Sequence, residues 1–298
     1  MRKTTRLREL INGDEILAMP IAHDATAAKL IELVGFKSLA TGGYPTTATL
    51  LGKPDLSILS MTEMVTHTKN ITEAVNIPVL ADGDTGYGDV INVMRTVHEF
   101  ELGGVAAIFI EDQLFPKRCG HMEGKQIIET DEMVAKLKAA IDARVDPDLV
   151  IMARTDAIAV TGIDDAIYRA NKYREAGADL IFVEAPQSIE HMERINREID
   201  APTMIIQIEG GKTPLLPMKE LEQIGYNVVV YPVSTLFAAA FAVRGVLEEL
   251  MKTGTTAGYR DRMYSFDDFN RLVGLEVLRE KESSFYKATA PAAACSSV

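Results

Sequence analysis

The sequence predicts an α/β protein in which eight strand–helix units close into a (β/α)8 barrel. Three observations predict it: short apolar runs recur eight times, each ends in a polar or glycine-bearing corner, and stretches with helical spacing separate them. Continuous apolar runs are typical of strands that are buried on both faces. Strands that alternate with helices pair in parallel, and eight such units form a barrel. An open doubly wound sheet is the alternative, but no Gly-x-Gly-x-x-Gly follows the first strand.

The predicted elements follow one another along the chain with room for a helix after each strand. The strands are residues 16–20, 36–40, 77–81, 105–110, 149–153, 179–183, 203–208 and 227–231. Apolar residues three or four positions apart mark the helices: Ala27, Leu30, Ile31 and Val34 form one stripe, and Met133, Leu137, Ala140 and Ile141 another. A further helix begins at Ile163 and ends near Gly177, because glycine suits the position after a helix.

The whole chain, residues 1–298, is predicted to be one barrel domain, because no linker-like stretch divides it. The barrel is expected to cover about residues 15–252. The helical character that continues over about residues 259–287 is surplus to the eight units, and the small-residue tail 288–298 is expected to be mobile.

Composition narrows the functional class. The chain has 43 acidic and 31 basic residues, a net charge of −12, and no long basic run, which argues against a nucleic-acid partner. The longest apolar stretch, residues 228–243, is interrupted by polar residues and is too short to span a bilayer. The basic N-terminus has no apolar signal core after it, and two cysteines make no disulfide framework. We therefore expect a cytoplasmic protein with no membrane partner.

Polar side chains gather where the predicted strands end, which is where barrels of this class carry their chemistry. These corners hold His23 and Asp24, Thr41 to Tyr44, Asp82 and Asp84, Glu111 and Asp112, Arg154 to Asp156, Glu184, and Gln207 with Glu209. Asp82, Asp84 and Glu111 can converge from neighbouring strands, and such a carboxylate group suits Mg²⁺ or Mn²⁺. The alternative is that one or two of them cap helices or pair with Arg154.

Two neighbouring corners suit an anion. Thr41, Gly42 and Gly43 offer successive backbone N–H groups that form a small anion-binding nest, unless they make only an ordinary tight turn. Arg154 faces the same space and suits bidentate contact with a carboxylate, unless it only balances Asp82 or Glu184. His23 also ends a strand, and a structural hydrogen bond there is as good an interpretation as catalysis.

A cysteine lies in the long connection after the fourth strand, within Lys117-Arg-Cys-Gly-His121. Its basic neighbours lower the pKa of the Cys119 thiol, so that it can exchange a proton near neutral pH. A buried inert thiol is the alternative, and it is less suited to so charged and glycine-bearing a loop. Long loops over a barrel mouth are often lids.

Seven runs together resemble the isocitrate lyase/phosphoenolpyruvate mutase superfamily, in family order from about residue 15 to residue 250. They are Thr41-Gly-Gly-Tyr44, Leu51-Gly-Lys-Pro-Asp55, Asp82-Gly-Asp-Thr-Gly-Tyr-Gly88, Ile110-Glu-Asp-Gln113, Lys117-Arg-Cys-Gly-His121, Ala153-Arg-Thr-Asp-Ala157 and Glu209-Gly-Gly-Lys-Thr-Pro214. The resemblance implies a homotetramer of (β/α)8 barrels that exchange their C-terminal helical region. It also implies Mg²⁺ near Asp55, Asp82, Asp84 and Glu111, partly through water.

The resemblance also indicates the reaction class. In this superfamily Lys-Arg-Cys-Gly-His marks the carbon–carbon lyases, and phosphonate-forming mutases lack the cysteine. The Glu209 run resembles lyases that act on alkylmalates or oxaloacetate, whereas 2-methylisocitrate lyases tend to have Phe at the position of Gly210. Ile206 stands where the family usually has a substrate-binding Asn, which favours a methyl group over a carboxylate. Gln207 is no replacement, because neighbouring strand residues point to opposite faces.

The implied reaction is Mg²⁺-dependent cleavage of a 2-hydroxy dicarboxylate, such as 2,3-dimethylmalate, into pyruvate and a carboxylic acid such as propionate. The expected substrate contacts are Thr41, Gly42, Gly43, Gly120, Arg154, Ile206 and Glu209. Tyr44, Asp55 or a metal-bound water removes the hydroxyl proton. Lys117, His121 and Glu184 stabilise or orient the enolate, and Cys119 donates the final proton.

Several alternatives share parts of this arrangement. A 2-methylisocitrate lyase needs the same machinery, and decarboxylation or hydrolysis of oxaloacetate needs the metal and the nest but no thiol acid. A phosphonate-handling mutase has support only from the turn at Gly210 and Gly211. A Schiff-base aldolase lacks its lysine, because Glu184 ends the sixth strand. A non-catalytic binding barrel is hard to reconcile with four acidic corners and the thiol loop.

Overall fold

The computed structural model describes residues 1–120 and 122–289, and the chain divides into two compact units, residues 1–239 and the residues from 240 onward. The first unit contains eight parallel strands in the order β1-β8-β7-β6-β5-β4-β3-β2. They are β1 (Leu17–Pro20), β2 (Leu39–Ala40), β3 (Val79–Asp82), β4 (Ala107–Glu111), β5 (Val150–Thr155), β6 (Leu180–Val183), β7 (Thr203–Ile206) and β8 (Val228–Tyr231). A parallel bridge between Ile21 and Ala40 joins β1 to β2 and closes the circle. The predicted (β/α)8 barrel is confirmed.

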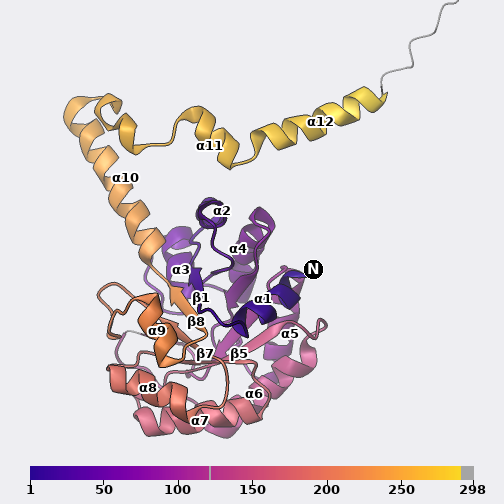
Figure 1. The fold of residues 1–298 in the computed structure, drawn as a ribbon, viewed down its shortest axis with the longest axis vertical. Coiled ribbons are helices and arrows are strands. Elements are labelled where there is room, and N and C mark those ends of the chain that lie inside the picture. The colour runs from indigo at the N-terminus through magenta and orange to yellow at the C-terminus, as the bar shows by residue number, and fades with distance from the viewer. Residues whose placement is uncertain (121, 290–298) are drawn as a thin grey trace, which may run out of the picture. The chain divides into compact units, whose positions relative to one another are not determined.

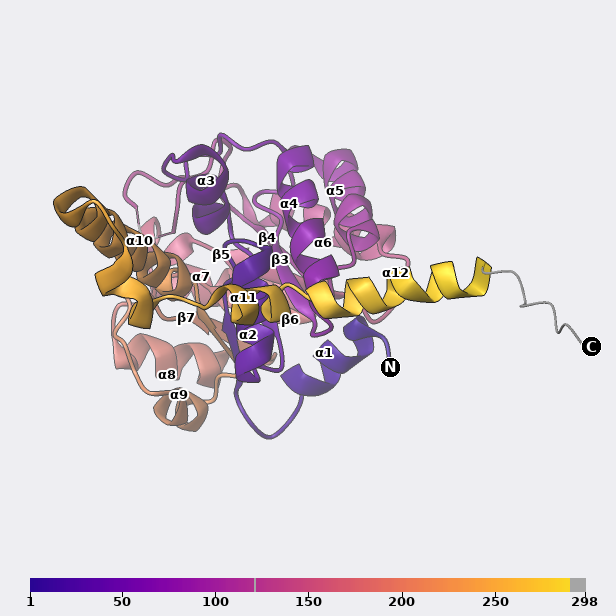
Figure 2. The ribbon, with the colours of Figure 1, turned by 90° about the horizontal axis from the view of Figure 1, so that it is seen from above.

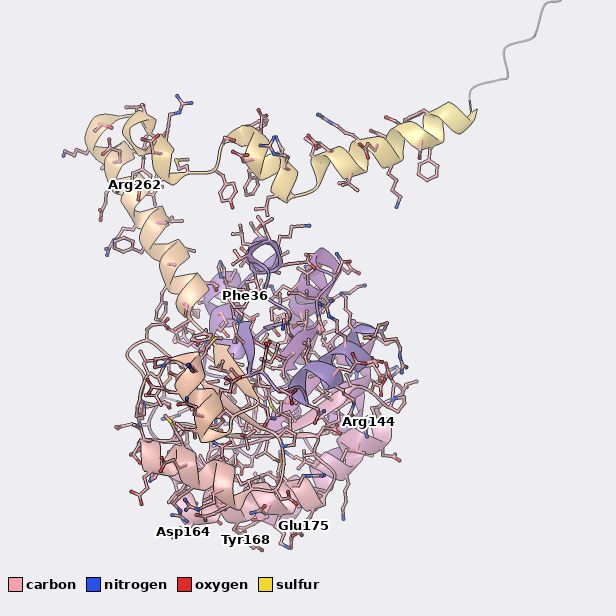
Figure 3. The ribbon with its side chains drawn as sticks, in the orientation of Figure 1. Phe36, Arg144, Asp164, Tyr168, Glu175 and Arg262 are labelled. Atoms are coloured by element: carbon pink, nitrogen blue, oxygen red, sulfur yellow. The ribbon has the colours of Figure 1, made fainter. Side chains whose placement is uncertain are left out.

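Helices connect successive strands on the outside of the barrel (Figures 1 and 2). They are α2 (Ala25–Val34), α3 (Gly43–Leu51), α4 (Met61–Ala74), α5 (Val90–Leu102), α6 (Thr130–Ala143), α7 (Ile163–Glu175), α8 (Ile189–Glu198) and α9 (Met218–Ile224). A further helix, α10 (Ser234–Thr253), follows the last strand, and its residues from 240 onward belong to the second unit. The outer face of α7 is polar, and Asp164, Tyr168 and Glu175 point away from the strands (Figure 3). Gly177 has φ +105° just after α7, as the sequence predicts. Among the described residues, no helix is both long and apolar enough to cross a membrane.

Two predicted features are wrong in detail. The second strand begins at Leu39 instead of residue 36, because Phe36 still donates its N–H to Ile31 O in the closing turn of α2. Val34, which the sequence places in the apolar stripe of α2, has 75% of its surface exposed. The helix ends at the left-handed Gly35, so its last residue lies beyond the face that packs on the barrel.

An additional helix, α1 (Lys3–Ile11), covers the N-terminal end of the barrel. Its Leu7 and Ile11 pack into the barrel interior. Arg8 donates to the carbonyls of Asp148 and Leu149 and to the carboxylate of Asp179, which precede β5 and β6. This closure leaves the opposite, C-terminal end of the strands for a site.

The second unit contains the rest of α10, the 3-10 helix η2 (Ala257–Arg262), α11 (Phe266–Leu272) and α12 (Leu275–Thr289). These helices agree with the surplus helical region expected over about residues 259–287. Residues 290–298 of the expected tail lie outside the described residues.

Candidate active site

Strand alternation decides which side chains reach the interior of the barrel. On β5, Val150 and Met152 join the inner apolar cluster, whereas Ile151 and Ala153 join the cluster under the helices. Because strand side chains alternate, the next inward position of β5 is Arg154. The same step of two leads from Leu80 to Asp82, from Phe109 to Glu111, from Phe182 to Glu184 and from Met204 to Ile206. The interior of the barrel is therefore apolar along most of the strands and strongly polar at their C-terminal ends.

A cavity of about 220 Å³ opens at this end. Its polar lining comprises Thr41, Gly42, Gly43, Tyr44, Asp55, Asp82, Lys117, Cys119, Gly120, Arg154, Glu184 and Glu209. Its apolar lining includes Ile21, Phe109, Met122, Met204, Ile206, Ile208, Val230, Val233 and Phe237. Nearly all of the residues that the sequence assigns to substrate, catalysis and metal therefore meet around one space. Asp84 and Glu111 do not line the cavity, but they contact Lys117 and Arg154, which do. His121 is outside the described residues.

Two carboxylates meet at Gly43: Asp55 from the connection between α3 and α4, and Asp82 from the end of β3. Asp82 accepts hydrogen bonds from Gly43 N at 2.8 Å and from Asp84 N at 2.9 Å. A Cβ at Gly43 would lie 2.9 Å from Lys117 Nζ, 3.0 Å from Asp55 Oδ2 and 3.4 Å from Asp82 Oδ2, so only glycine fits there. One N–H of the predicted nest is therefore already used by Asp82. Thr41 Oγ1 is buried and has no hydrogen-bond partner among the described residues.

Lys117 is the cation of this acidic cluster. Its Nζ lies 2.8 Å from Asp55 Oδ2 and 2.8 Å from Asp84 Oδ1, and all three side chains are buried. Burial by itself lowers the pKa of Lys117, but Asp84 and Asp82 raise that pKa well above its usual range. Burial raises the pKa of Asp84 to about 6, against the opposing charge of Lys117. The ammonium thus lies between two of the carboxylates that the sequence assigns to a metal.

Arg154 makes a second buried network. Its guanidinium lies 3.2 Å from Glu111, 3.3 Å from Glu184 and 2.9 Å from Asp156. It also lies over the ring of Phe182, 5.1 Å from the centroid. Burial raises the pKa of Asp156, but Arg154 and Lys125 outweigh this effect and hold the pKa at about 2. Arg154 is therefore positioned by three carboxylates at the cavity wall. Of the two counter-charges that the sequence offers for it, Asp82 or Glu184, the structure pairs it with Glu184.

The loop after β4 is held in place by side-chain contacts to its backbone. Gln113 donates to Arg118 O at 2.8 Å and accepts from Arg118 N at 3.0 Å, and Ser57 donates to Lys117 O at 3.1 Å. Lys125 Nζ donates to Gly120 O and to Asp156 Oδ1. These contacts bring the half-buried Cys119 to the cavity.

Ile206 and Gln207 point in opposite directions, as strand alternation predicts. Ile206 lines the cavity, whereas the Gln207 amide donates to Pro214 O and accepts from Leu216 N. Glu209 is exposed at the cavity rim and accepts a hydrogen bond from Ser234. Phe237, at the start of α10, makes an edge-to-face contact with Tyr44, with ring centroids 6.4 Å apart.

Two strand-end residues have structural roles. Asp24 caps α2 by accepting from Ala27 N at 2.7 Å, and His23 Nδ1 lies 3.1 Å from Thr235 Oγ1. Sequence reasoning missed Asp156, Lys125 and Phe237 as parts of the site. Asp156 belongs to a run that the sequence does single out, but nothing local indicates that it pairs with Lys125 across the loop.

The charge balance of the site fits a divalent cation. Six buried carboxylates (Asp55, Asp82, Asp84, Glu111, Asp156 and Glu184) surround three buried cations (Lys117, Lys125 and Arg154). Glu111 Oε1 is buried without a hydrogen-bond partner in the described part of the chain, and burial raises the pKa of Glu111 well above its usual range. Carboxylate oxygens are the donors that Mg²⁺ prefers. In the described residues, however, no three of these groups already form a ligand set, since Lys117 lies between them.

This arrangement has known counterparts. The model of the family described as phosphoenolpyruvate phosphomutase matches residues 7–251. The chain belongs to the phosphoenolpyruvate phosphomutase family. Among family relatives, it is 48% identical to 2,3-dimethylmalate lyase of Eubacterium barkeri over 96% of this chain and 99% of that protein. It is 41% identical to 2-methylisocitrate lyase of Aeropyrum pernix over 93% of this chain and 89% of that protein.

Solved structures of this family have the same fold. Oxaloacetate acetylhydrolase with 3,3-difluorooxalacetate matches with a TM-score of 0.90 and 33% identity, over 95% of this chain and 96% of that one. A 2,3-dimethylmalate lyase matches with a TM-score of 0.89 and 32% identity, over 100% and 99%. Phosphonopyruvate hydrolase with oxalate and Mg²⁺ matches with a TM-score of 0.87 and 29% identity, over 95% and 99%. Within the family, the chain is an enzyme, a carbon–carbon lyase.

Proposed function

We propose that this enzyme is a Mg²⁺-dependent lyase that splits an alkylmalate-type dicarboxylate, such as 2,3-dimethylmalate, into pyruvate and propionate. One observation carries the proposal: a single cavity joins a carboxylate cluster, a thiol-bearing loop and an apolar wall. The carboxylates can bind a cation, and that cation can bind the hydroxyl and carboxylate oxygens of the substrate. The Cys119 thiol can protonate the fragment that becomes propionate, and the apolar wall can pack against the alkyl groups of the substrate. The 48% identity to a 2,3-dimethylmalate lyase supports the same substrate class.

In this proposal Asp55, Asp82, Asp84 and Glu111 hold Mg²⁺, or Mn²⁺ in its place, partly through water. The cation, when bound, supplies positive charge to the hydroxyl and carboxylate oxygens of the substrate. Glu111 Oε1, which has no hydrogen-bond partner among the described residues, and the excess of buried carboxylates support this role. The solved relative that contains Mg²⁺ and oxalate supports it independently.

The substrate carboxylate that becomes part of pyruvate is held at the end of β2. Thr41 Oγ1 is buried in the cavity lining and can donate a hydrogen bond to it. The backbone of Gly42 and Gly43 lets this anion approach closely, because neither residue has a side chain. Arg154 assists from the neighbouring wall, where its position is fixed by Asp156.

Two proton transfers accompany the cleavage. Tyr44 and Asp55, which both line the cavity, are the candidates to remove the 2-hydroxyl proton. The C2–C3 bond then breaks as the C2 carbonyl of pyruvate forms, and its electron pair remains on C3 as the enolate of propionate. Lys117 and Glu184 orient this fragment, with Gly120 beside it and His121 from the same loop. Cys119 gives its proton to C3 and is reprotonated from solvent.

The apolar wall favours a methyl group over an additional carboxylate. Ile206, Ile208 and Phe237 offer no hydrogen-bond donor from their side chains, and Glu209 at the rim repels an anion. A buried carboxylate without a partner costs far more than a methyl group in the same place. This wall favours an alkylmalate over 2-methylisocitrate, although both substrates release pyruvate.

The proposal includes a cytoplasmic homotetramer whose subunits exchange their C-terminal helical regions. In the second unit α11 has no buried residue, and Met251 and Phe266 are 89% and 84% exposed. An exposed surface with many large apolar side chains, such as this one, usually packs against a partner. Light scattering on the purified protein tests this state, and a monomer at micromolar concentration would contradict it.

A substrate panel tests the proposed function. Pyruvate release is measured with 2,3-dimethylmalate, 2-methylisocitrate, 2-methylmalate and oxaloacetate in the presence of Mg²⁺. We expect kcat/KM to be highest for 2,3-dimethylmalate. A higher value for 2-methylisocitrate would replace the substrate assignment and leave the reaction class, whereas no pyruvate from any alkylated acid would contradict both.

A further inference from the structure

We propose that Lys125 is a positioning residue, which fixes Gly120, the residue after the thiol, against the cavity wall by joining the Gly120 carbonyl to Asp156. The inference rests on the proposed function, because that function gives Cys119 the role of proton donor. Lys125 does not line the cavity, so it acts through the loop and not on the substrate.

The first observation is the burial of an ion pair inside a loop. The Lys125 side chain is 2% exposed and the Asp156 side chain is fully buried, with Nζ 2.9 Å from Oδ1. Removing two charges from water is costly, and good geometry with further hydrogen bonds is needed to offset it. Asp156 has such bonds: its carboxylate accepts from Arg154 at 2.9 and 3.1 Å, and its N–H donates to Asp112 at 2.9 Å.

The second observation is that Lys125 also donates to the carbonyl of Gly120, the residue after the thiol. The space beside the Gly120 Cα is also closed. A Cβ there would lie 2.4 Å from Glu184 Cδ and 2.5 Å from Arg154 Nη2. Gly120 is therefore held by Lys125 at its carbonyl and packs closely on the Arg154–Glu184 pair at its Cα.

The third observation concerns the rest of the loop. The Gln113 amide holds both backbone groups of Arg118, and Leu114 N donates to Gln126 O at 2.8 Å. These contacts fix the start and the base of the loop. In the middle of the loop, Gly120 is joined through Lys125 to Asp156, which directly follows β5. Since Cys119 directly precedes Gly120, a shift of Gly120 also shifts the thiol.

The substitution Lys125→Met removes the charge and the donor but keeps an unbranched chain. We expect kcat to fall by ~10- to 100-fold with little change in KM, since a displacement of about 1 Å in a catalytic group can have this effect. Lys125→Arg keeps the charge and is expected to lose less than tenfold. The control is Lys172→Met, which removes an exposed lysine paired with Glu175 on α7 and should leave kcat unchanged.

Two further measurements separate positioning from general stability. In a Cys119→Ser background, Lys125→Met should cause little additional loss of kcat, because the group that it positions is already absent. Alkylation of Cys119 by iodoacetamide, followed by peptide mass mapping with Cys295 as internal reference, should become several-fold faster in Lys125→Met. This second measurement needs no turnover, so it decides the positioning role even if no substrate in the panel is cleaved.

Three results would overturn the inference: wild-type kcat in Lys125→Met, an equal loss of kcat with and without Cys119, or an unchanged alkylation rate. If Lys125→Met does not yield folded protein, Lys125→Gln is used, since it keeps one donor toward Gly120 without the charge. The same three results in that variant would overturn the inference as well.

Discussion

Lys117 Nζ lies 2.8 Å from Asp84 Oδ1, in a position where both side chains are almost fully buried. Lys117 belongs to the loop after β4, whereas Asp84 follows β3. The contact therefore ties the thiol-bearing loop to the carboxylates proposed for Mg²⁺. An ammonium and a divalent cation compete for the same negative charge, so metal binding and the place of this loop are expected to depend on each other.

Turnover is expected to depend on a divalent cation. Removal of metal with a chelator should abolish pyruvate release, and added Mg²⁺ or Mn²⁺ should restore it. Asp84→Ala should behave like the chelated enzyme at any practical Mg²⁺ concentration. The control Asp164→Ala removes an exposed carboxylate on α7 and should keep wild-type activity. Full turnover in buffer shown by elemental analysis to be metal-free would contradict the metal role.

Cys119→Ser tests the proton donor. Serine keeps the size of the side chain but is a far weaker acid, so kcat should fall by ~10²- to 10⁴-fold with little change in KM. Any decarboxylation of oxaloacetate should suffer much less, because solvent can protonate the released pyruvate enolate. The two activities are compared in the same preparation. Equal and small losses in both would mean that the thiol is structural.

Ile206→Asn tests the apolar wall. An amide at this position should shift preference from 2,3-dimethylmalate toward 2-methylisocitrate by ~10- to 200-fold in the ratio of kcat/KM. The control is Ile205→Val, because Ile205 points under the helices and does not line the cavity. That variant should lose about 0.5–1.5 kcal/mol of stability and keep the ratio. An unchanged ratio in Ile206→Asn would show that this side chain does not contact the substrate.

Gly120→Ala tests how closely the loop packs on the cavity wall. The new Cβ would lie 2.4 Å from Glu184 Cδ, so either the loop or the Arg154–Glu184 pair must move. We expect kcat to fall by at least ~10²-fold. Gly13→Ala serves as the control, since its Cβ would approach only backbone oxygens at ordinary contact distances of 3.4 and 3.5 Å. Similar kcat values for the two variants would show that the loop takes another position during turnover.

The barrel and the inward set of strand-end residues follow from patterns within the sequence. Apolar runs locate all eight strands, and alternation along them assigns Asp82, Glu111, Arg154, Glu184 and Ile206 to the same interior. The end of a strand is less predictable. The second run shortens to Leu39–Ala40 because the closing turn of α2 takes the N–H of Phe36, a contact that no periodicity reveals.

The contacts that the loop after β4 makes with the rest of the site cannot be predicted from sequence patterns. Lys125 pairs with Asp156 across 31 positions, and Lys117 pairs with Asp55 across 62. Such partners depend on how a long loop folds over the strands, and residue type alone shows only that a charge needs a counter-charge. The same reason applies to Arg154: the sequence offers Asp82 or Glu184 as its counter-charge, and the structure pairs it with Glu184 together with Glu111 and Asp156.

Cleavage of 2,3-dimethylmalate in D₂O, followed by NMR, tests the central claim most directly. The proposed chemistry predicts pyruvate and propionate in equal amounts, with one deuterium on C2 of propionate delivered through the exchanged Cys119 thiol. The deuterium count is taken from initial product, before pyruvate exchanges its methyl protons. Pyruvate without propionate, propionate without deuterium at C2, or an intact substrate with Mg²⁺ present would contradict the account.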